Sequence, residues 1–311
     1  MTDWLQSVLE TAGPQARRLL PLWRFMLVVS VLVFALVIGM LLWAVCRRRR
    51  AEPPSERGMT RTIIGATALT VLILFVFLVL DFTVGRALAR PPRPGPVVSI
   101  TGHQWWWEIE YDDSLPQRRV RTANEVHVPV GQPVVFRLRS ADVIHSFWVP
   151  SLGGKMDQIP GRENRLWLQA DTPGVYGGPC AEFCGHQHAK MALVVVAEPP
   201  EKFARWYEAQ LAPAVAPTDS SAARGQRVFV EGRCATCHAV EGTPAGSNIG
   251  PVLTHLASRL TLGAGALPNT RGNLAAWILD PQTLKPGAKM PPNELSPADL
   301  HALLDYLGTL R

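Results

Sequence analysis

Four of the five cysteines form two close pairs, one in the middle third of the chain and one in the last third. The first pair is Cys180 and Cys184, in the segment Cys-Ala-Glu-Phe-Cys-Gly-His-Gln-His-Ala-Lys-Met that ends at Met191. His188 lies within this segment, and His145 lies upstream of it. Thiolate, imidazole and thioether groups are soft or borderline ligands that together favour copper. The sequence therefore predicts a copper site here.

A mononuclear electron-transfer copper site uses one cysteine, whereas this segment offers two. Two thiolates can bridge two copper ions, each of which then takes one histidine (His145 or His188) and one weak axial ligand. Met191 is the candidate axial ligand of one copper, and a backbone carbonyl between the cysteines is the candidate for the other. Such a closed site suits electron transfer. A structural zinc site is the alternative, although zinc would not explain the methionine; a thiol oxidoreductase fits less well, because the spacing is not Cys-x-x-Cys.

The second pair lies in the motif Cys234-Ala-Thr-Cys237-His238, and Cys-x-x-Cys-His is the attachment signature of c-type haem. We expect two thioether bonds from the cysteines and iron binding by the histidine. Met290 is the expected sixth ligand, because it lies in a proline-stiffened loop and is the only methionine after Met191. Methionine ligation indicates electron transfer rather than gas binding. A redox Cys-x-x-Cys pair is the alternative.

Residues 1–95 are expected to anchor these sites in a membrane through two helices, at about 25–45 and 63–82. Both regions contain charge-free apolar runs long enough to cross a hydrocarbon core of about 30 Å. The loop between them is rich in arginine, which favours a cytoplasmic loop and puts both chain termini on the other side. These arginines are Arg47, Arg48, Arg49, Arg50, Arg57 and Arg61.

The net charge of +6 arises in this first third of the chain, and the rest is nearly neutral. No later domain is therefore basic enough to bind nucleic acid through its phosphates. Short β-branched and aromatic runs separated by Gly and Pro predict an all-β sandwich over 96–200. A short helix and an Ala/Pro-rich linker follow over 201–222, and residues 223–311 are expected to form an all-α domain. The result is a multi-domain chain.

Residues 20–200 resemble subunit II of haem–copper cytochrome c oxidases, in which a two-helix hairpin precedes a cupredoxin domain with a dinuclear CuA centre. The aromatic stretch Gly102–Tyr111 and the segment Pro150–Arg162 carry this resemblance. It implies that electrons enter CuA through Trp105. It also implies that Glu182 binds copper through its main-chain carbonyl, and that its carboxylate and Asp157 hold Mg²⁺ or Mn²⁺ at the subunit I interface.

The last third is similar to class I cytochromes c, including the stretch Asn248-Ile-Gly250-Pro251, where the proline carbonyl accepts a hydrogen bond from the iron-binding histidine. A cytochrome c domain fused to subunit II is typical of the caa₃-type oxidases. One departure concerns the start of the second helix, where Arg61 stands at the position of the family's usual acidic residue and Glu52 and Glu56 are the nearest acids.

The resemblance implies an electron-transfer subunit of cytochrome c oxidase that passes electrons from haem c through CuA to subunit I, where O₂ is reduced. The implied partners are subunit I with haem a/a₃ and CuB, subunit III and a cytochrome c donor. The implied location is the bacterial plasma membrane, with two spans and with both termini and both cofactor domains on the periplasmic side. An electron-delivery subunit of a nitric oxide reductase and a membrane-anchored copper or redox sensor are the alternatives.

Overall fold

The computed structural model describes residues 6–47, 55–89, 91, 93 and 95–311. Within this range the chain forms two compact units, one of residues 17–90 and one of the N-terminal residues together with 91–311. Arg48, Arg49 and Arg50, which entered the topology prediction, and Glu52, one of the acids nearest to Arg61, lie outside the described residues.

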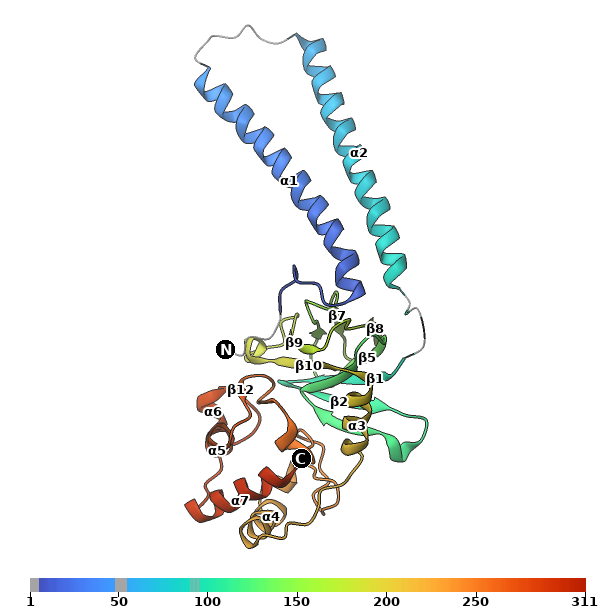
Figure 1. Cartoon of the computed structure of the whole chain (residues 1–311). Coiled ribbons are helices and arrows are strands. Elements are labelled where there is room, and N and C mark those ends of the chain that lie inside the picture. Colours follow the sequence, from blue (N-terminus) through green and yellow to red (C-terminus); the bar gives the residue numbers. More distant parts are fainter. Residues whose placement is uncertain (1–5, 48–54, 90, 92, 94) are drawn as a thin grey trace. The chain divides into compact units, whose positions relative to one another are not determined.

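Two apolar helices make up the N-terminal hairpin, α1 (Pro14–Cys46) and α2 (Glu56–Leu88) (Figure 1). Each has 33 residues, so each extends beyond the predicted apolar run, and each is long and apolar enough to cross a membrane. Helix α2 begins where the Ser55 side chain accepts a hydrogen bond from the backbone N–H of Gly58 and caps the free end of the helix.

The middle domain is a β-sandwich, as the sequence predicts. Its first sheet has the order β3-β2-β1-β5-β8 and contains β1 (Val97–His103), β2 (Trp106–Asp112), β3 (Val120–Ala123), β5 (Val134–Ser140) and β8 (Asn164–Leu168). The second sheet has the order β4-β10-β9 and contains β4 (Glu125–Pro129), β9 (Gly174–Pro179) and β10 (Ala192–Glu198). A separate pair joins β6 (His145–Phe147) to β7 (Met156–Gln158).

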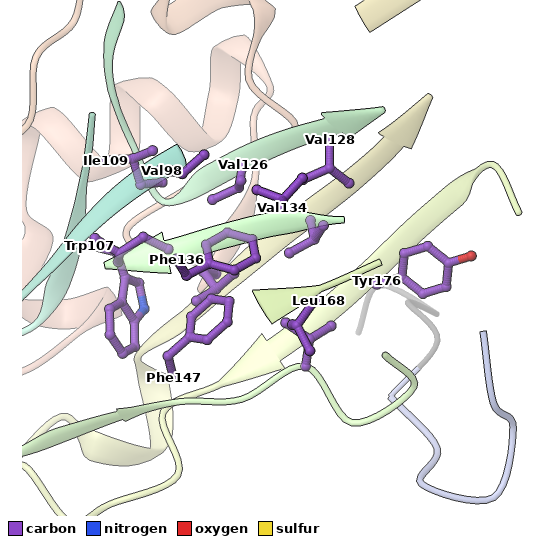
Figure 2. Packing of buried hydrophobic residues seen from close by; sticks show 14 of the residues in the cluster. Val98, Trp107, Ile109, Val126, Val128, Val134, Phe136, Phe147, Leu168 and Tyr176 are labelled. Carbon is purple, nitrogen blue, oxygen red and sulfur yellow. The ribbon is translucent and has the colours of Figure 1, made fainter. Parts of the chain in front are cut away.

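Alternation of side chains along the strands builds the core of this sandwich. In β1 and β2 every second residue is buried, which gives each strand one inner and one outer face. Trp107, Phe136 and Phe147 are fully buried, and the rings of Phe136 and Phe147 lie 4.9 Å apart (Figure 2). This core fixes the strand ends from which the cysteine segment and His145 emerge.

Helix α3 (Pro200–Gln210) leaves the sandwich and packs back on it, with Trp206 against Tyr111 at 5.3 Å between ring centroids. The linker that follows contacts the last domain, where the backbone N–H of Ala214 donates to the carbonyl of Glu241 at 2.9 Å. Helix α4 begins at Ser220 behind an Asp219 cap, so it already includes the last residues that the sequence analysis placed in the linker.

The last domain is helical, with α4 (Ser220–Glu231), α5 (Arg271–Leu279), α6 (Pro281–Leu284) and α7 (Pro297–Thr309), short 3₁₀ turns at Cys234–Thr236 and Leu256–Ser258, and a minimal hairpin of Thr261–Leu262 with Leu267–Pro268. Helix α7 begins at a Ser296 cap. It crosses α4 closely because Gly225 has no Cβ; an added Cβ would lie 1.9 Å from the carbonyl oxygen of Ala302. The crossing buries Phe229 and Tyr306 in the domain core.

Candidate copper and haem sites

The loop between β9 and β10 brings the predicted copper ligands together. The two sulfurs of Cys180 and Cys184 lie 3.8 Å apart. The Nδ1 atom of His145 is 3.9 Å from the sulfur of Cys180, and the Nδ1 atom of His188 is 3.7 Å from that of Cys184. The Met191 sulfur lies 3.8 Å from the Cys184 sulfur. Two thiols, each beside its own imidazole, match a pair of copper ions bridged by two sulfurs.

The sixth donor lies in the backbone of the same loop. The carbonyl oxygen of Glu182 is 3.3 Å from the sulfur of Cys180, whereas Met191 lies beside the other cysteine, Cys184. Each cysteine therefore has one imidazole and one weaker donor beside it: His145, from β6, and the Glu182 carbonyl at Cys180, and His188 and Met191 at Cys184. This donor set fits a dinuclear copper centre better than zinc, which would use only the two cysteines and two histidines.

Burial and hydrogen bonding prepare these side chains for a metal. His145, Cys180 and Cys184 are all buried, and their ligand atoms lie within 4.8 Å of one another. The hydrogen bond from the Cys184 thiol, together with the one from His145, lowers the pKa of Cys180 to about 3. A thiolate is the form of cysteine that binds a metal, so one thiol of the pair is already disposed to ionise.

Asp142 orients His145, a role that the sequence analysis did not assign. Its carboxylate lies 2.9 Å from the Nε2 atom of His145 and accepts a hydrogen bond from it, which leaves Nδ1 free for a metal. Burial alone would lower the pKa of His145, but hydrogen bonds to Cys180 and Asp142 raise it above its ordinary value. The signal in the sequence was an acidic residue three positions before the candidate ligand.

Gly102 lies against the other side of the same imidazole. A Cβ at this position would lie 2.7 Å from Cδ2 of His145, so only glycine leaves room for the ring. Gly102 belongs to strand β1, which pairs with β2 and β5 in the first sheet. The sheet therefore backs the histidine directly.

Trp105 contacts the copper loop through its indole N–H. This group donates to the carbonyl of Cys184 at 3.0 Å, and the side chain of Gln104 donates to the same carbonyl at 2.8 Å. Of the three consecutive tryptophans, Trp107 is fully buried in the sandwich core, while Trp105 and Trp106 are half-buried. The pleat of strand β2 puts Trp107 and Trp106 on opposite faces, and Trp105 lies in the turn that leads into it.

The two residues predicted to hold Mg²⁺ or Mn²⁺ lie on separate elements. Asp157 is in β7, and its carbonyl accepts a hydrogen bond from Asn164. Glu182 is in the copper loop, and its carboxylate accepts a hydrogen bond from the backbone N–H of Phe183 at 3.2 Å. The described contacts do not join the two carboxylates, so the metal site stays a prediction.

A cavity of about 310 Å³ marks the candidate haem site in the last domain. Its lining includes both cysteines of the Cys-x-x-Cys-His motif, His238, Met290 and apolar side chains from the domain core. His238 Nδ1 lies 2.8 Å from the carbonyl oxygen of Pro251, as the sequence analysis predicts. Burial lowers the pKa of His238, which keeps the imidazole neutral and able to bind iron through Nε2. Two thiols, an oriented imidazole and a thioether around one cavity fit a c-type haem.

The sandwich domain contributes to the wall of this cavity. Gln104, Trp105 and Trp106 line it together with the haem-motif residues. The same indole that donates to the copper loop therefore lies beside the haem cavity. A residue of the copper domain and the candidate haem ligands thus line one cavity.

Two further histidines, His127 and His255, contact polar groups of the protein. His127 lies between Glu125 and Glu198, at 3.0 Å from a carboxylate oxygen of each. His255 is buried and lies within hydrogen-bonding distance of the carbonyl oxygens of Arg311 and Gln210. These contacts engage both ring nitrogens of each histidine.

Two family models match the chain. Residues 115–198 match the periplasmic domain of cytochrome c oxidase subunit II, and residues 222–311 match cytochrome c.

Two relatives match most of the chain. Cytochrome c oxidase subunit 2 of Alkalihalophilus pseudofirmus is 37% identical over 319 residues, which cover 98% of this chain and 91% of the relative. The protein of the same name from Bacillus sp. (strain PS3) is 32% identical over 289 residues, which cover 85% of this chain and 80% of the relative. The crystal structure of the periplasmic domain of subunit II of cytochrome oxidase of Bradyrhizobium japonicum is 32% identical, with a TM-score of 0.37, and covers 39% of this chain and 96% of that one.

Proposed function

This chain belongs to the cytochrome c oxidase subunit 2 family, and we propose that it accepts electrons at a covalent haem c and delivers them through CuA to subunit I. It is part of an oxidase complex, anchored to the membrane, with its cofactor domains in the periplasm. When bound, both groups act as one-electron carriers. Reduction of O₂ takes place in subunit I.

The copper ligands we propose are the five side chains and the carbonyl that converge on the cysteine pair. Cys180 and Cys184 would bridge the two ions, and the spacing of 3.8 Å between their sulfurs supports this role. His145 and the Glu182 carbonyl lie beside Cys180. His188 and Met191 lie beside Cys184. Because protein groups surround the pair, the site is suited to electron transfer without exchange of ligands.

For the haem, we propose thioether attachment at Cys234 and Cys237 and axial ligation by His238 and Met290. The Pro251 carbonyl holds the imidazole of His238 in one tautomer, and Gly250 packs against its edge. These contacts fix the ligand before any iron binds. A pre-oriented ligand moves little when the charge on the iron changes.

The observation that carries the proposed route of transfer is the double contact of Trp105. Its indole N–H donates to the carbonyl of Cys184, and its ring lines the haem cavity. Trp105 is therefore hydrogen-bonded to the copper loop and also lies in the wall of the haem cavity. We propose that electrons enter the copper site through this residue.

Further roles follow from family membership. Glu182 and Asp157 are proposed to hold Mg²⁺ or Mn²⁺ at the subunit I interface. A cytochrome c is the proposed donor, and subunit III is a proposed further partner. Helices α1 and α2 are proposed to cross the membrane as a hairpin, with both chain termini on the periplasmic side.

The test is spectroscopy of the complex purified from membranes, with copper supplied during growth. We expect an electron-paramagnetic-resonance pattern of one electron shared by two copper nuclei, together with the optical band of a low-spin c-type haem and consumption of O₂. A signal from a single copper nucleus, or a haem without methionine ligation, would contradict the proposed ligands. Consumption of nitric oxide in place of O₂ would contradict the oxidase assignment.

A further inference from the structure

Lys285 is a buried lysine at the boundary between the haem domain and the copper domain. It follows α6 directly, and only 2% of its surface is exposed. Its Nζ atom donates to the carbonyl of Trp105 in the copper domain and to that of Gly263 in the haem domain, each at 2.8 Å. One side chain thus connects both domains at the backbone of the tryptophan that lines the haem cavity.

Burying a lysine has a cost, because its charged form loses the solvation of water. Burial lowers the pKa of Lys285 to about 7, well below the ordinary value for lysine. Lysines are almost never fully buried unless their N–H groups find partners. The two carbonyls are such partners, so the position of Lys285 depends on the domains being together.

The chain on either side of Lys285 also contacts the copper domain. Lys190, next to the proposed ligand Met191, donates from Nζ to the carbonyl of Leu284 at 2.8 Å. Gln187 in the copper loop donates to the carbonyl of Pro286. The segment 284–286 is therefore bonded to the copper domain at three successive residues, twice to the copper loop and once to Trp105.

A fourth bond joins the domains through the backbone. The N–H of Ala192, the first residue of β10, donates to the carbonyl of Ala264 at 2.9 Å. Ala264 neighbours Gly263, the second acceptor of Lys285. The haem domain is thus held by a compact set of bonds centred on a buried amine.

From these contacts we propose that Lys285 is a positioning residue for electron transfer, which holds the haem domain against the backbone of Trp105. The inference rests on the proposed function of the two sites. In the step concerned, one electron leaves the ferrous iron and reduces the copper pair, while no bond forms or breaks. Lys285 gives up neither an electron nor a proton; it keeps the donor and acceptor at a fixed separation instead of leaving the haem domain to diffuse on its linker.

The test measures transfer within the purified oxidase complex after a light pulse that reduces haem c. In the parent protein we expect a rate that does not change with solvent viscosity, because the domains are already in contact. Lys285→Met keeps an unbranched apolar stem and removes the amine. A neutral hydrogen bond is worth roughly a factor of two to ten in an equilibrium constant, so the loss of both bonds of Lys285 is worth roughly five- to a hundredfold. We expect Lys285→Met to slow transfer at least about fivefold and to make it depend on viscosity.

Lys190→Met is the matched control, because it removes an exposed lysine that donates to the same segment. We expect it to change the rate less than about twofold, since exposed polar pairs contribute little. Haem and copper spectra should match those of the parent in both variants. Should Lys285→Met fail to assemble, Lys285→Gln, which retains N–H donors on a shorter stem, is expected to show an intermediate rate.

Three results would overturn the inference: a parental, viscosity-independent rate in Lys285→Met, a parental rate in Lys285→Gln where that variant stands in for it, or equal slowing in Lys190→Met. Altered spectra in Lys285→Met would also overturn it, because they would mean that Lys285 supports a cofactor site and not the contact between domains. A parent complex without transfer from haem to copper would refute the proposed function itself, which this comparison of variants does not.

Discussion

Replacing Gly250 by alanine tests how tightly the chain holds the proposed iron ligand. A Cβ on Gly250 would lie 2.7 Å from Cε1 of His238 and 3.0 Å from its Nδ1. Carbon atoms pack at about 3.5–4.0 Å, so the imidazole or the backbone must move by roughly 0.8 Å or more. The backbone is not free to retreat, since the N–H of Gly250 donates to the carbonyl of Cys237 at 2.8 Å.

The strain can therefore be relieved only at a cost to the site. If the ring of His238 moves, its hydrogen bond to Pro251 and its alignment with the iron suffer. If the backbone moves, the bond to Cys237 breaks, within the haem attachment motif. Overpacking of this kind costs about 1–3 kcal/mol. Since each 1.4 kcal/mol is a factor of ten, native ligation should be disfavoured by roughly five- to 150-fold.

The assay compares Gly250→Ala with Gly246→Ala in the purified complex. Gly246 is a suitable control because a Cβ there would meet no atom within 4 Å. We expect Gly246→Ala to keep the low-spin haem spectrum and the parental stability to denaturant. Gly250→Ala should lose part of the low-spin signal and unfold its haem domain at lower denaturant concentration. Equal spectra and equal unfolding midpoints for the two variants would refute the reasoning.

Three further predictions concern the copper domain. Met191→Leu preserves volume in a buried position, so it should cost less than about 1.5 kcal/mol of stability while shifting the copper spectrum and potential; a change in the haem band would contradict separate sites. Gly102→Ala should lower the copper content per chain, measured by metal analysis, because its Cβ would displace His145; full occupancy would argue against the clash. Burial alone would lower the pKa of His127, but its hydrogen bonds to the carboxylates of Glu125 and Glu198 raise that pKa above its ordinary value. The hydrogen bond from His127 is the main reason that the pKa of Glu198 falls to about 2. Protonated His127 thus stabilises the folded state fully below pH 6.5, and this stabilisation is lost as the pH rises through the folded-state pKa of His127. Ionised Glu198 stabilises the folded state fully above pH 4.5, and this stabilisation is lost as the pH falls toward 2. In urea unfolding across this range, His127→Gln should flatten the alkaline part of the profile, and an unchanged profile would contradict the pairing.

Local chemistry explains why so much was predictable from the sequence. The spacing Cys234-x-x-Cys237-His238 predicts a haem attachment site within five residues, and the cysteine loop ending at Met191 holds most of the candidate copper ligands within twelve. Apolar runs long enough to cross a membrane and alternating strands are likewise periodic features of short windows. The hydrogen bond from His238 to Pro251 was predictable because it spans only thirteen positions and because the stretch Asn248–Pro251 is similar to class I cytochromes c.

Other features depend on segments that are distant in the sequence. Trp105 meets Cys184 across 79 positions, and Lys285 meets Trp105 across 180. A pattern within a short stretch of sequence cannot predict contacts between residues so far apart in the chain. The Pro/Gly-rich loop around Lys285 predicts an exposed side chain, and only the packing of the haem domain on the copper domain buries this lysine.

The sequence by itself determined which groups could bind copper and haem, because ligand chemistry belongs to residue types at short spacing. It also determined that two apolar helices and a sandwich precede a helical domain. The tertiary structure alone decided that Asp142 orients a ligand, that Gly102 and Gly250 leave room for imidazoles, and that Trp105 lies between the two candidate sites. Those outcomes are set by close packing, which depends on the three-dimensional meeting of surfaces and not on the order of residues along the chain.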